Sequence, residues 1–113
     1  AVLAFGRGHD IRLPPERVEA LTRAGVDHVE VGLRAEHISL AEPGDADGAA
    51  FTSDVILVEE HGADSIAVVT LGEREVMARV KPGAAHVGDK ARRFRLDVDA
   101  LHLFHPETGR RLV

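Results

Sequence analysis

The sequence contains no cysteine, no asparagine, no tryptophan and no tyrosine. Without cysteine the chain can form neither a disulfide nor a thiolate nucleophile, and a zinc site would need histidine and carboxylate ligands alone. Without asparagine it offers no acceptor for N-glycosylation. Its only aromatic residues of the Phe, Tyr and Trp type are four phenylalanines. The core must therefore be built mainly from valine, leucine, isoleucine and alanine.

Long apolar runs are missing as well. The longest, residues 55–58 and 66–69, have the length of strands and fall far short of the ~20 residues that a bilayer span requires. The chain begins with Ala1 and not with methionine, so we expect it to be a segment of a longer protein. Its 113 residues have the size of one domain, which we place at residues 1–113.

The charge is divided unevenly along the chain. Residues 1–73 carry 5 basic and 14 acidic side chains, net −9, whereas residues 74–113 carry 9 basic and 5 acidic ones, net +4, which together give −5. An acidic total disfavours general nucleic-acid binding, which depends on neutralising phosphates, and the scarcity of aromatics disfavours base stacking. The basic C-terminal third leaves a local contact with an anion or an acidic protein open.

Short alternating segments separated by turn residues dominate the pattern. Apolar and polar residues alternate over residues 29–33, and further strand-like segments follow at 52–60, 65–71, 74–80 and 91–96. This spacing predicts a mostly β protein, and we favour a small closed barrel because it leaves few sheet edges exposed. One short helix is expected between Pro14 and Gly25. Residues 41–50, which contain Pro43, two glycines and three acids, are expected to form an exposed connector.

Two hairpins and a closing strand complete the expected fold. Residues 6–10 and the pair Gly72-Glu73 have the composition of hairpin turns. Leu103 and Phe104 belong to the closing strand, and we expect one of them to be fully buried.

The seven histidines and the serines do not form a recognisable catalytic or metal-binding pattern. His9, His28, His61 and His86 fall in expected loops, where a solvated histidine is the ordinary case. His102 and His105 are three residues apart, which places them on opposite faces of an extended segment. No serine lies in a Gly-x-Ser-x-Gly turn and no phosphate-binding loop occurs. We therefore expect no enzymatic activity from this chain alone.

A group of arginines is the most notable charged feature. Arg93 and Arg95 share one face of an expected strand, and Arg110 and Arg111 follow near the C-terminus. They are candidates for an anion site or for contact with an acidic partner. The alternative is that outward arginines simply keep a sheet hydrated and protect its edges.

Two segments resemble a known family. Residues 31–38, Val-Gly-Leu-Arg-Ala-Glu-His-Ile, resemble the Gly-Ile/Leu-Arg-Pro-Glu-His-Ile/Leu signature found in ATPase subunits of bacterial carbohydrate importers, the maltose and glycerol-phosphate type of ABC transporter. Residues 101–112 resemble the Leu-His-Leu-Phe-Asp-x-x-Thr-Gly-x-x-Leu ending of the same subunits. Residues 55–62 and 87–89 match two segments between them. The positions that carry this resemblance are Gly32, Arg34, Glu36, His37, Gly62, Gly88, Asp89, Phe104 and Gly109. Ala35, His61 and His105 depart from the usual Pro, Leu and Asp.

The resemblance implies a function as well as a fold. It points to the C-terminal regulatory domain of those subunits, the transport-associated OB (TOBE) domain, an OB-type barrel of the kind shared with molybdate-binding modules. It implies an upstream nucleotide-binding domain that holds ATP and magnesium, a cytoplasmic place beneath membrane permeases, pairing with a second copy and contact with regulatory proteins. This segment would hold no cofactor itself. The alternative is a barrel that senses a small oxyanion or a sugar phosphate.

Overall fold

The computed structural model describes residues 2–45 and 47–113, which form ten β-strands, one α-helix and two short 3-10 turns. The helix α1 spans Pro15–Ala24, and the 3-10 turns η1 and η2 span Ala35–His37 and Asp47–Ala49. The strands are β1 (Val2–Ala4), β2 (Asp10–Arg12), β3 (Glu30–Gly32), β4 (Ile38–Leu40), β5 (Ala50–Ser53), β6 (Leu57–His61), β7 (Asp64–Leu71), β8 (Arg74–Val80), β9 (Arg92–Leu96) and β10 (His102–Phe104). The predicted mostly β class with one helix is confirmed.

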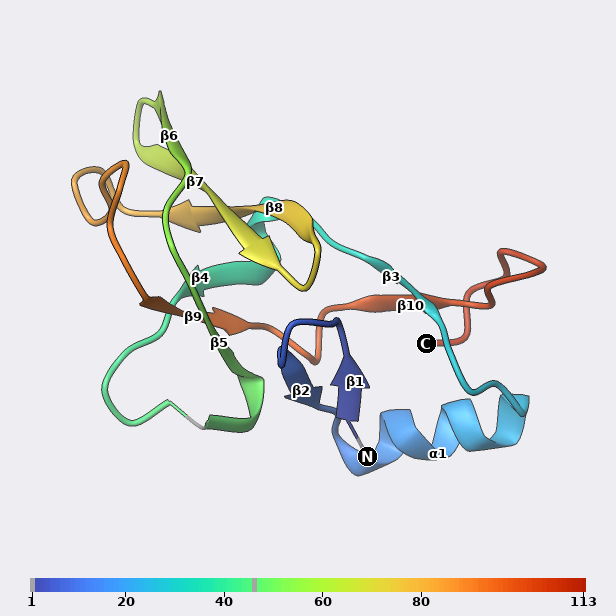
Figure 1. The fold of residues 1–113 in the computed structure, drawn as a ribbon. Helices are drawn as coiled ribbons and strands as arrows, with labels where there is room; N and C mark the ends of the chain where they lie inside the picture. Colours follow the sequence, from blue (N-terminus) through green and yellow to red (C-terminus); the bar gives the residue numbers. More distant parts are fainter. Residues whose placement is uncertain (1, 46) are drawn as a thin grey trace.

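Two three-stranded sheets form the main body of the molecule. Their strand orders are β4-β9-β5 and β6-β7-β8, and every pairing is antiparallel. Strand β5 leads into β6, and β8 packs beside β4 and η1, so the six strands follow one another around a common core (Figure 1). Among the described residues no backbone ladder joins β8 to β4. The expectation of a fully closed barrel is therefore wrong: the 3-10 turn η1 lies against β8 where a longer strand would have to pair, and packing completes the ring there.

The core lies between these two sheets. In β7 the residues Ser65, Ala67, Val69 and Leu71 are buried and alternate with exposed or half-buried ones, as the period of a strand requires. Phe94 and Leu96 of β9, Ile11, Ile38, Leu101 and Leu103 are completely buried. Aliphatic side chains thus supply most of the interior, as the composition predicts.

The β1–β2 hairpin packs against the tip of the β7–β8 hairpin. Both predicted hairpins are present, with Leu3 opposite Ile11 in the first and Leu71 opposite Arg74 in the second. Gly72 has a φ of +64°, and a Cβ at this position would lie 1.8 Å from the carbonyl oxygen of Phe5. Only glycine fits there, because both its backbone conformation and the approach of the neighbouring hairpin exclude a side chain.

Strands β3 and β10 pair with each other beside the main body. Leu103 lies opposite Val31, and α1 runs alongside, which gives the molecule its elongated shape of 43 × 27 × 23 Å (Figure 1). Strand β10 thus pairs with β3 and does not close the ring. Leu103 is completely buried, which confirms that one of the two apolar residues of this strand is a core residue, whereas Phe104 is half-buried.

The helix and the connector follow simple local rules. Helix α1 begins with Pro15 at its first position and ends at Gly25, whose φ of +70° is left-handed, as predicted. It is not long and apolar enough to span a membrane, and no other described segment is a helix of that kind. In the connector, residues 42–44 are exposed, whereas residues 48–50 are half-buried and Gly48 approaches the side chain of Arg12. Ala46 lies outside the described residues.

Candidate functional site

The turn η1 is held in place by its own backbone and by the segment that leads from β9 to β10. Arg34 N–H donates to Nδ1 of His37 (3.2 Å), and His37 N–H donates to the carbonyl oxygen of Arg34 (2.9 Å). The His37 carbonyl in turn accepts a hydrogen bond from Asp97 N–H at 2.8 Å. Because Nδ1 of His37 accepts, its proton resides on Nε2 when the ring is neutral.

Glu36 links the same turn to strand β8. Its carboxylate lies 3.6 Å from the guanidinium of Arg79, which is also 3.9 Å from Asp64. A hydrogen bond from the backbone of Glu36 itself, followed by the charge of Arg79, lowers the pKa of this carboxyl group. Glu36 is therefore negatively charged at neutral pH and already has a basic partner.

The first and last motif segments meet in the β3–β10 pair. Gly32 lies opposite His102, and a Cβ at Gly32 would lie 3.0 Å from Cε2 of Phe104. The rings of His102 and Phe104 meet edge to face at 6.3 Å. The missing side chain of Gly32 thus makes room for the Phe104 ring, which gives both motif positions a packing role.

Asp89 organises the turn before β9. Its Oδ2 accepts hydrogen bonds from His86 N–H (2.9 Å) and from Nη1 of Arg92 (2.6 Å), and these two interactions, the backbone one first, lower its pKa. Gly88 N–H donates to the carbonyl of Val55, and Val55 N–H donates to the carbonyl of Asp89. The backbone hydrogen bonds of Gly88 and Asp89 with Val55 therefore join this turn to the segment between β5 and β6.

Comparison with known proteins agrees with these structural relationships. The family model of the TOBE domain matches residues 31–104, which include the η1 turn, all of β10 and all of β3 except Glu30. The chain belongs to the TOBE domain family. The prediction of a TOBE domain from the two motifs is confirmed. The packing of the Phe104 ring against Gly32 lies inside the matched segment.

Curated relatives of this TOBE domain include import and transport ATP-binding proteins. The sn-glycerol-3-phosphate import ATP-binding protein UgpC of Ralstonia nicotianae is 38% identical over 86 residues, which cover 76% of this chain and 23% of the relative. UgpC of Cereibacter sphaeroides is 36% identical over 110 residues, 96% of this chain and 30% of the relative. The sulfoquinovosyl glycerol transport ATP-binding protein SmoE of Agrobacterium fabrum is 31% identical over 108 residues, which cover 96% of this chain and 29% of the relative. The chain thus spans less than a third of the length of these relatives.

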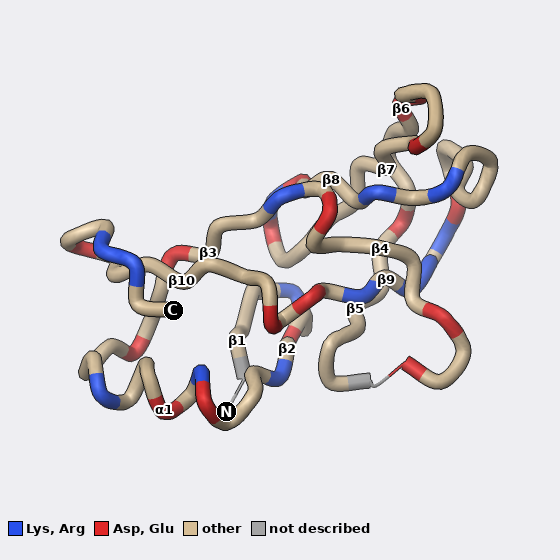
Figure 2. Tube along the Cα trace, turned by 180° about the vertical axis from the view of Figure 1, so that it is seen from behind, with Lys and Arg blue, Asp and Glu red and all other residues tan. Residues whose placement is uncertain are grey.

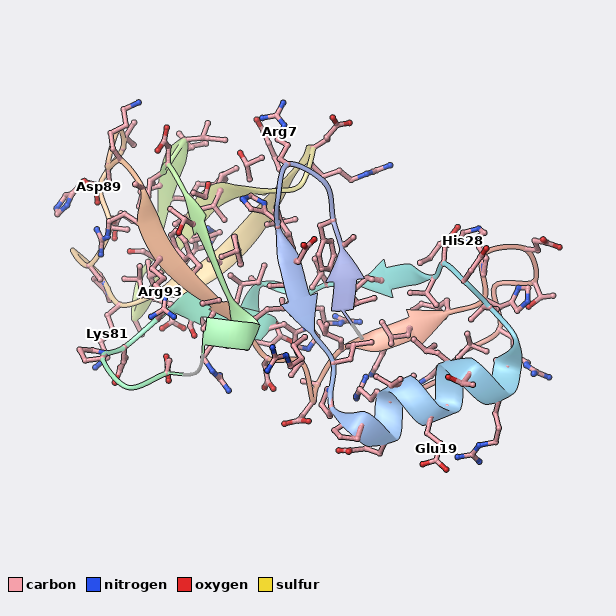
Figure 3. The ribbon with its side chains drawn as sticks, turned by 60° about the horizontal axis from the view of Figure 1, so that its bottom comes forward. Arg7, Glu19, His28, Lys81, Asp89 and Arg93 are labelled. Carbon is pink, nitrogen blue, oxygen red and sulfur yellow. The ribbon has the colours of Figure 1, made fainter. Side chains whose placement is uncertain are left out.

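The four arginines proposed from the sequence do not form one site in this TOBE domain. Arg93 and Arg95 lie on β9, opposite Thr52 and Ser39 of the neighbouring strands, whereas Arg110 and Arg111 follow β10. Figure 2 shows the basic positions of β9 and those of the C-terminal turn in different parts of the molecule. In Figure 3 Arg93 lies toward the same end as Lys81 and Asp89, far from His28 beyond the end of α1. Gly62 and Gly109 lie in turns with positive φ.

His9 was not recognised from the sequence as a structural residue. It is half-buried and not a solvated loop residue, because its Nδ1 accepts a hydrogen bond from Gly72 N–H (2.8 Å) and its Nε2 lies 3.1 Å from the carbonyl oxygen of Thr52. Its ring also packs on Phe51 at 5.7 Å. These partners are 43 and 63 residues away in the chain, so no local pattern could indicate them. His28, His61 and His86 are exposed.

Asp54 is a second residue that the motifs did not indicate. Its Oδ1 accepts a hydrogen bond from Ala91 N–H at 2.9 Å, and its Oδ2 lies 3.5 Å from Nζ of Lys90. The backbone hydrogen bond, more than the lysine, lowers its pKa. Ala91 has a φ of +49°, an unfavourable conformation for alanine that this hydrogen bond helps to hold.

No described group of residues has the arrangement of a catalytic or metal site. In the described parts of the chain no three histidine, aspartate or glutamate residues are placed to hold a metal ion. A half-open cavity of about 390 Å³ lies between the β1–β2 hairpin, α1 and β3, and its lining is mostly apolar, with Thr22, Asp27 and His28 as its polar residues. Asp27 and His28 form an exposed pair at 2.7 Å, and His28 lowers the pKa of Asp27.

Proposed function

We propose that this TOBE domain is the non-catalytic regulatory and pairing domain of an ATPase subunit in a bacterial importer of glycerol phosphate or a related sugar compound. The observation that carries the proposal is the joining of the two family motifs in the β3–β10 pair, together with import and transport ATP-binding proteins as relatives. ATP and magnesium would bind to the remainder of the subunit. The domain would act at the inner face of the membrane, where the subunit meets its permease, and receive regulatory proteins.

An apolar row on the outer face of the β6-β7-β8 sheet supports contact with a second copy. Val68 lies opposite both Leu57 and Met77 in the ladder, so the three side chains share one face of the sheet. Leu57 is 46% exposed and Met77 is 56% exposed. An apolar row of this kind is typical of an interaction surface, and a twofold arrangement would cover it with the same row of the partner.

Two measurements on the 113-residue chain test this proposal. Calorimetric titration with ATP and magnesium should give no binding, and a saturable ATP site would contradict the non-catalytic role. In sedimentation, Met77→Glu should shift a self-association equilibrium toward the monomer by placing an uncompensated charge in the row. Glu75→Gln, a change outside the row on the same strand, is the matched control. Equal sedimentation of the wild type and Met77→Glu at every concentration would reject this surface for pairing.

A further inference from the structure

Strand geometry gathers basic side chains around His102. Arg34 has extended backbone angles (φ −124°, ψ 158°), so the alternation of β3 continues through it and places Arg34 on the same face as Gly32. Gly32 lies opposite His102. On the other side of β10, Arg111 forms a bridge with Phe104, two residues after His102 and on its face. Residues far apart in the sequence thus share one small surface.

His37 and Arg17 add to this group from two further elements. The η1 turn brings the His37 ring back toward Arg34. The backbone N–H of Arg34 donates to Nδ1 of His37, so the Nε2–H of His37 is not used in this hydrogen bond. Arg17 reaches from α1 to the carbonyl oxygens of Leu101 (2.5 Å) and Asp99 (2.6 Å), just before His102. Basic groups from α1, from the β3–η1 segment and from the C-terminal segment therefore lie near the start of β10.

Among the described residues no aspartate or glutamate forms an ion pair with Arg17, Arg34 or Arg111. Nε of Arg111 donates instead to the oxygen of Val113, the last residue of the chain, at 3.2 Å. Glu36, the acid nearest in sequence to His37, is held by Arg79. The charge of Arg111 and the burial of the ring lower the pKa of His102, and His37, Arg34 and Arg17 act in the same direction.

We propose that Arg34, His37, His102 and Arg111 form a binding site for a phosphate group, carried by inorganic phosphate or by a phosphate monoester. Two guanidinium groups offer paired N–H donors to the tetrahedral oxygens, and the imidazoles offer one N–H each. A dianion neutralises more of this charge than a single carboxylate does. A polyanion fits less well, because the chain carries a net charge of −5 and Glu30 and Asp99 lie beside the cluster. The site is independent of the pairing surface on β6, β7 and β8.

Nuclear magnetic resonance of the 113-residue chain tests the site directly. Titration with sodium phosphate at constant ionic strength should shift the ring resonances of His102 and His37 along a saturable curve. Glycerol phosphate in a parallel titration separates the two sources, because tighter binding than phosphate assigns the site to a monoester and equal binding assigns it to the free ion. Linear, unsaturated shifts with both probes would mean screening alone and would overturn the proposal.

Variants that remove the same charge at different positions distinguish a specific phosphate site from a general electrostatic attraction. Arg111→Gln and Arg34→Gln should each weaken phosphate binding by about tenfold or more, since a hydrogen bond to a charged group contributes roughly that factor. Arg110→Gln removes the same charge from the neighbouring position and should change the affinity less than about twofold. Melting temperatures of all three variants establish that they fold. Equal weakening by Arg110→Gln would overturn the proposal, as would a glutamate-rich peptide that binds where phosphate does not.

The same variants have a second readout that needs no ligand. Because Arg111 is the largest cause of the lowered pKa of His102, Arg111→Gln should raise that pKa, and Arg110→Gln should leave it unchanged. The other charged groups around the ring are His37, Arg34 and Arg17, with Glu30 across the ladder and Asp97 and Asp99 in the preceding turn. An unchanged His102 titration in Arg111→Gln would show that the two groups do not share a surface and would overturn the site.

Discussion

The ring of Phe104 fills the space in which Gly32 would carry a side chain. A methyl group on Gly32 would lie 3.0 Å from Cε2 of that ring and 3.7 Å from Cβ of His102. The φ of Gly32 is not in the left-handed region, so the need for glycine at this position comes from packing and not from the backbone. This contact joins two motifs that lie about seventy residues apart in the sequence.

Gly32→Ala should therefore destabilise the domain by forcing the Phe104 ring aside. Overpacking of this kind costs about 1–3 kcal/mol, and urea unfolding followed by circular dichroism measures it. In a Phe104→Leu background the same change should cost clearly less, because the smaller side chain leaves room for the added methyl group. Equal costs in both backgrounds would show that the ring is not the obstacle.

His9 should contribute to stability although it lies in a hairpin turn. His9→Ala leaves Gly72 N–H without its acceptor in a part-buried position and removes the ring from Phe51. An unsatisfied donor of this kind costs about 1–3 kcal/mol. His28→Ala is the control, since His28 is exposed and its hydrogen-bond partner Asp27 is the adjacent residue. Chemical unfolding should separate the two variants; if they unfold at the same urea concentration, the His9 contacts do not stabilise the fold.

The sequence is sufficient to predict the local helices and strands and part of the candidate site. Alternation predicts which residues of β7 face the core, and Pro15 and Gly25 predict the ends of α1, because both signals act within one turn or one strand. The contacts of His9 with Gly72 and of Arg17 with Leu101 span 63 and 84 residues. They depend on how separate hairpins and strands pack, which periodicity does not encode.

The predictions of a closed barrel and of an arginine group are limited in the same way, because both depend on how separate strands pack. Equal spacing of strands does not reveal that η1 takes the place of a longer pairing between β4 and β8. The pairing of β10 with β3 decides that Leu103 is buried while Phe104 is half-buried, and alternation alone does not say which of the two faces inward. Of the four arginines chosen for their charge, Arg111 alone joins the cluster around His102, because the strands place Arg93 and Arg95 on another sheet.

Acid should weaken the turns before β9 through Asp54 and Asp89. Both carboxyl groups have a pKa below the ordinary value, mainly because backbone N–H groups donate to the ionised form. Their stabilising effect is present above the pKa of the unfolded chain, about 4, and is lost as the pH falls through the lower folded value. Between pH 6 and pH 3 the gap in melting temperature between wild type and Asp89→Asn should therefore narrow. The exposed Glu107→Gln serves as control; a gap that stays constant in Asp89→Asn would contradict a role for this charge.

Ala35→Pro should stabilise the domain. Ala35 is the first residue of η1, and the preceding Arg34 has the extended angles that a residue before proline favours. No backbone hydrogen bond of the η1 segment uses the N–H of Ala35, whereas His37 N–H donates to Arg34. Proline at position 35 therefore restricts the unfolded chain without removing a contact, which is worth about 0.4–1 kcal/mol. His37→Pro, two residues later, should destabilise because it removes that hydrogen bond. A loss of stability in Ala35→Pro, measured by thermal unfolding, would show that the turn has a backbone geometry that proline cannot adopt.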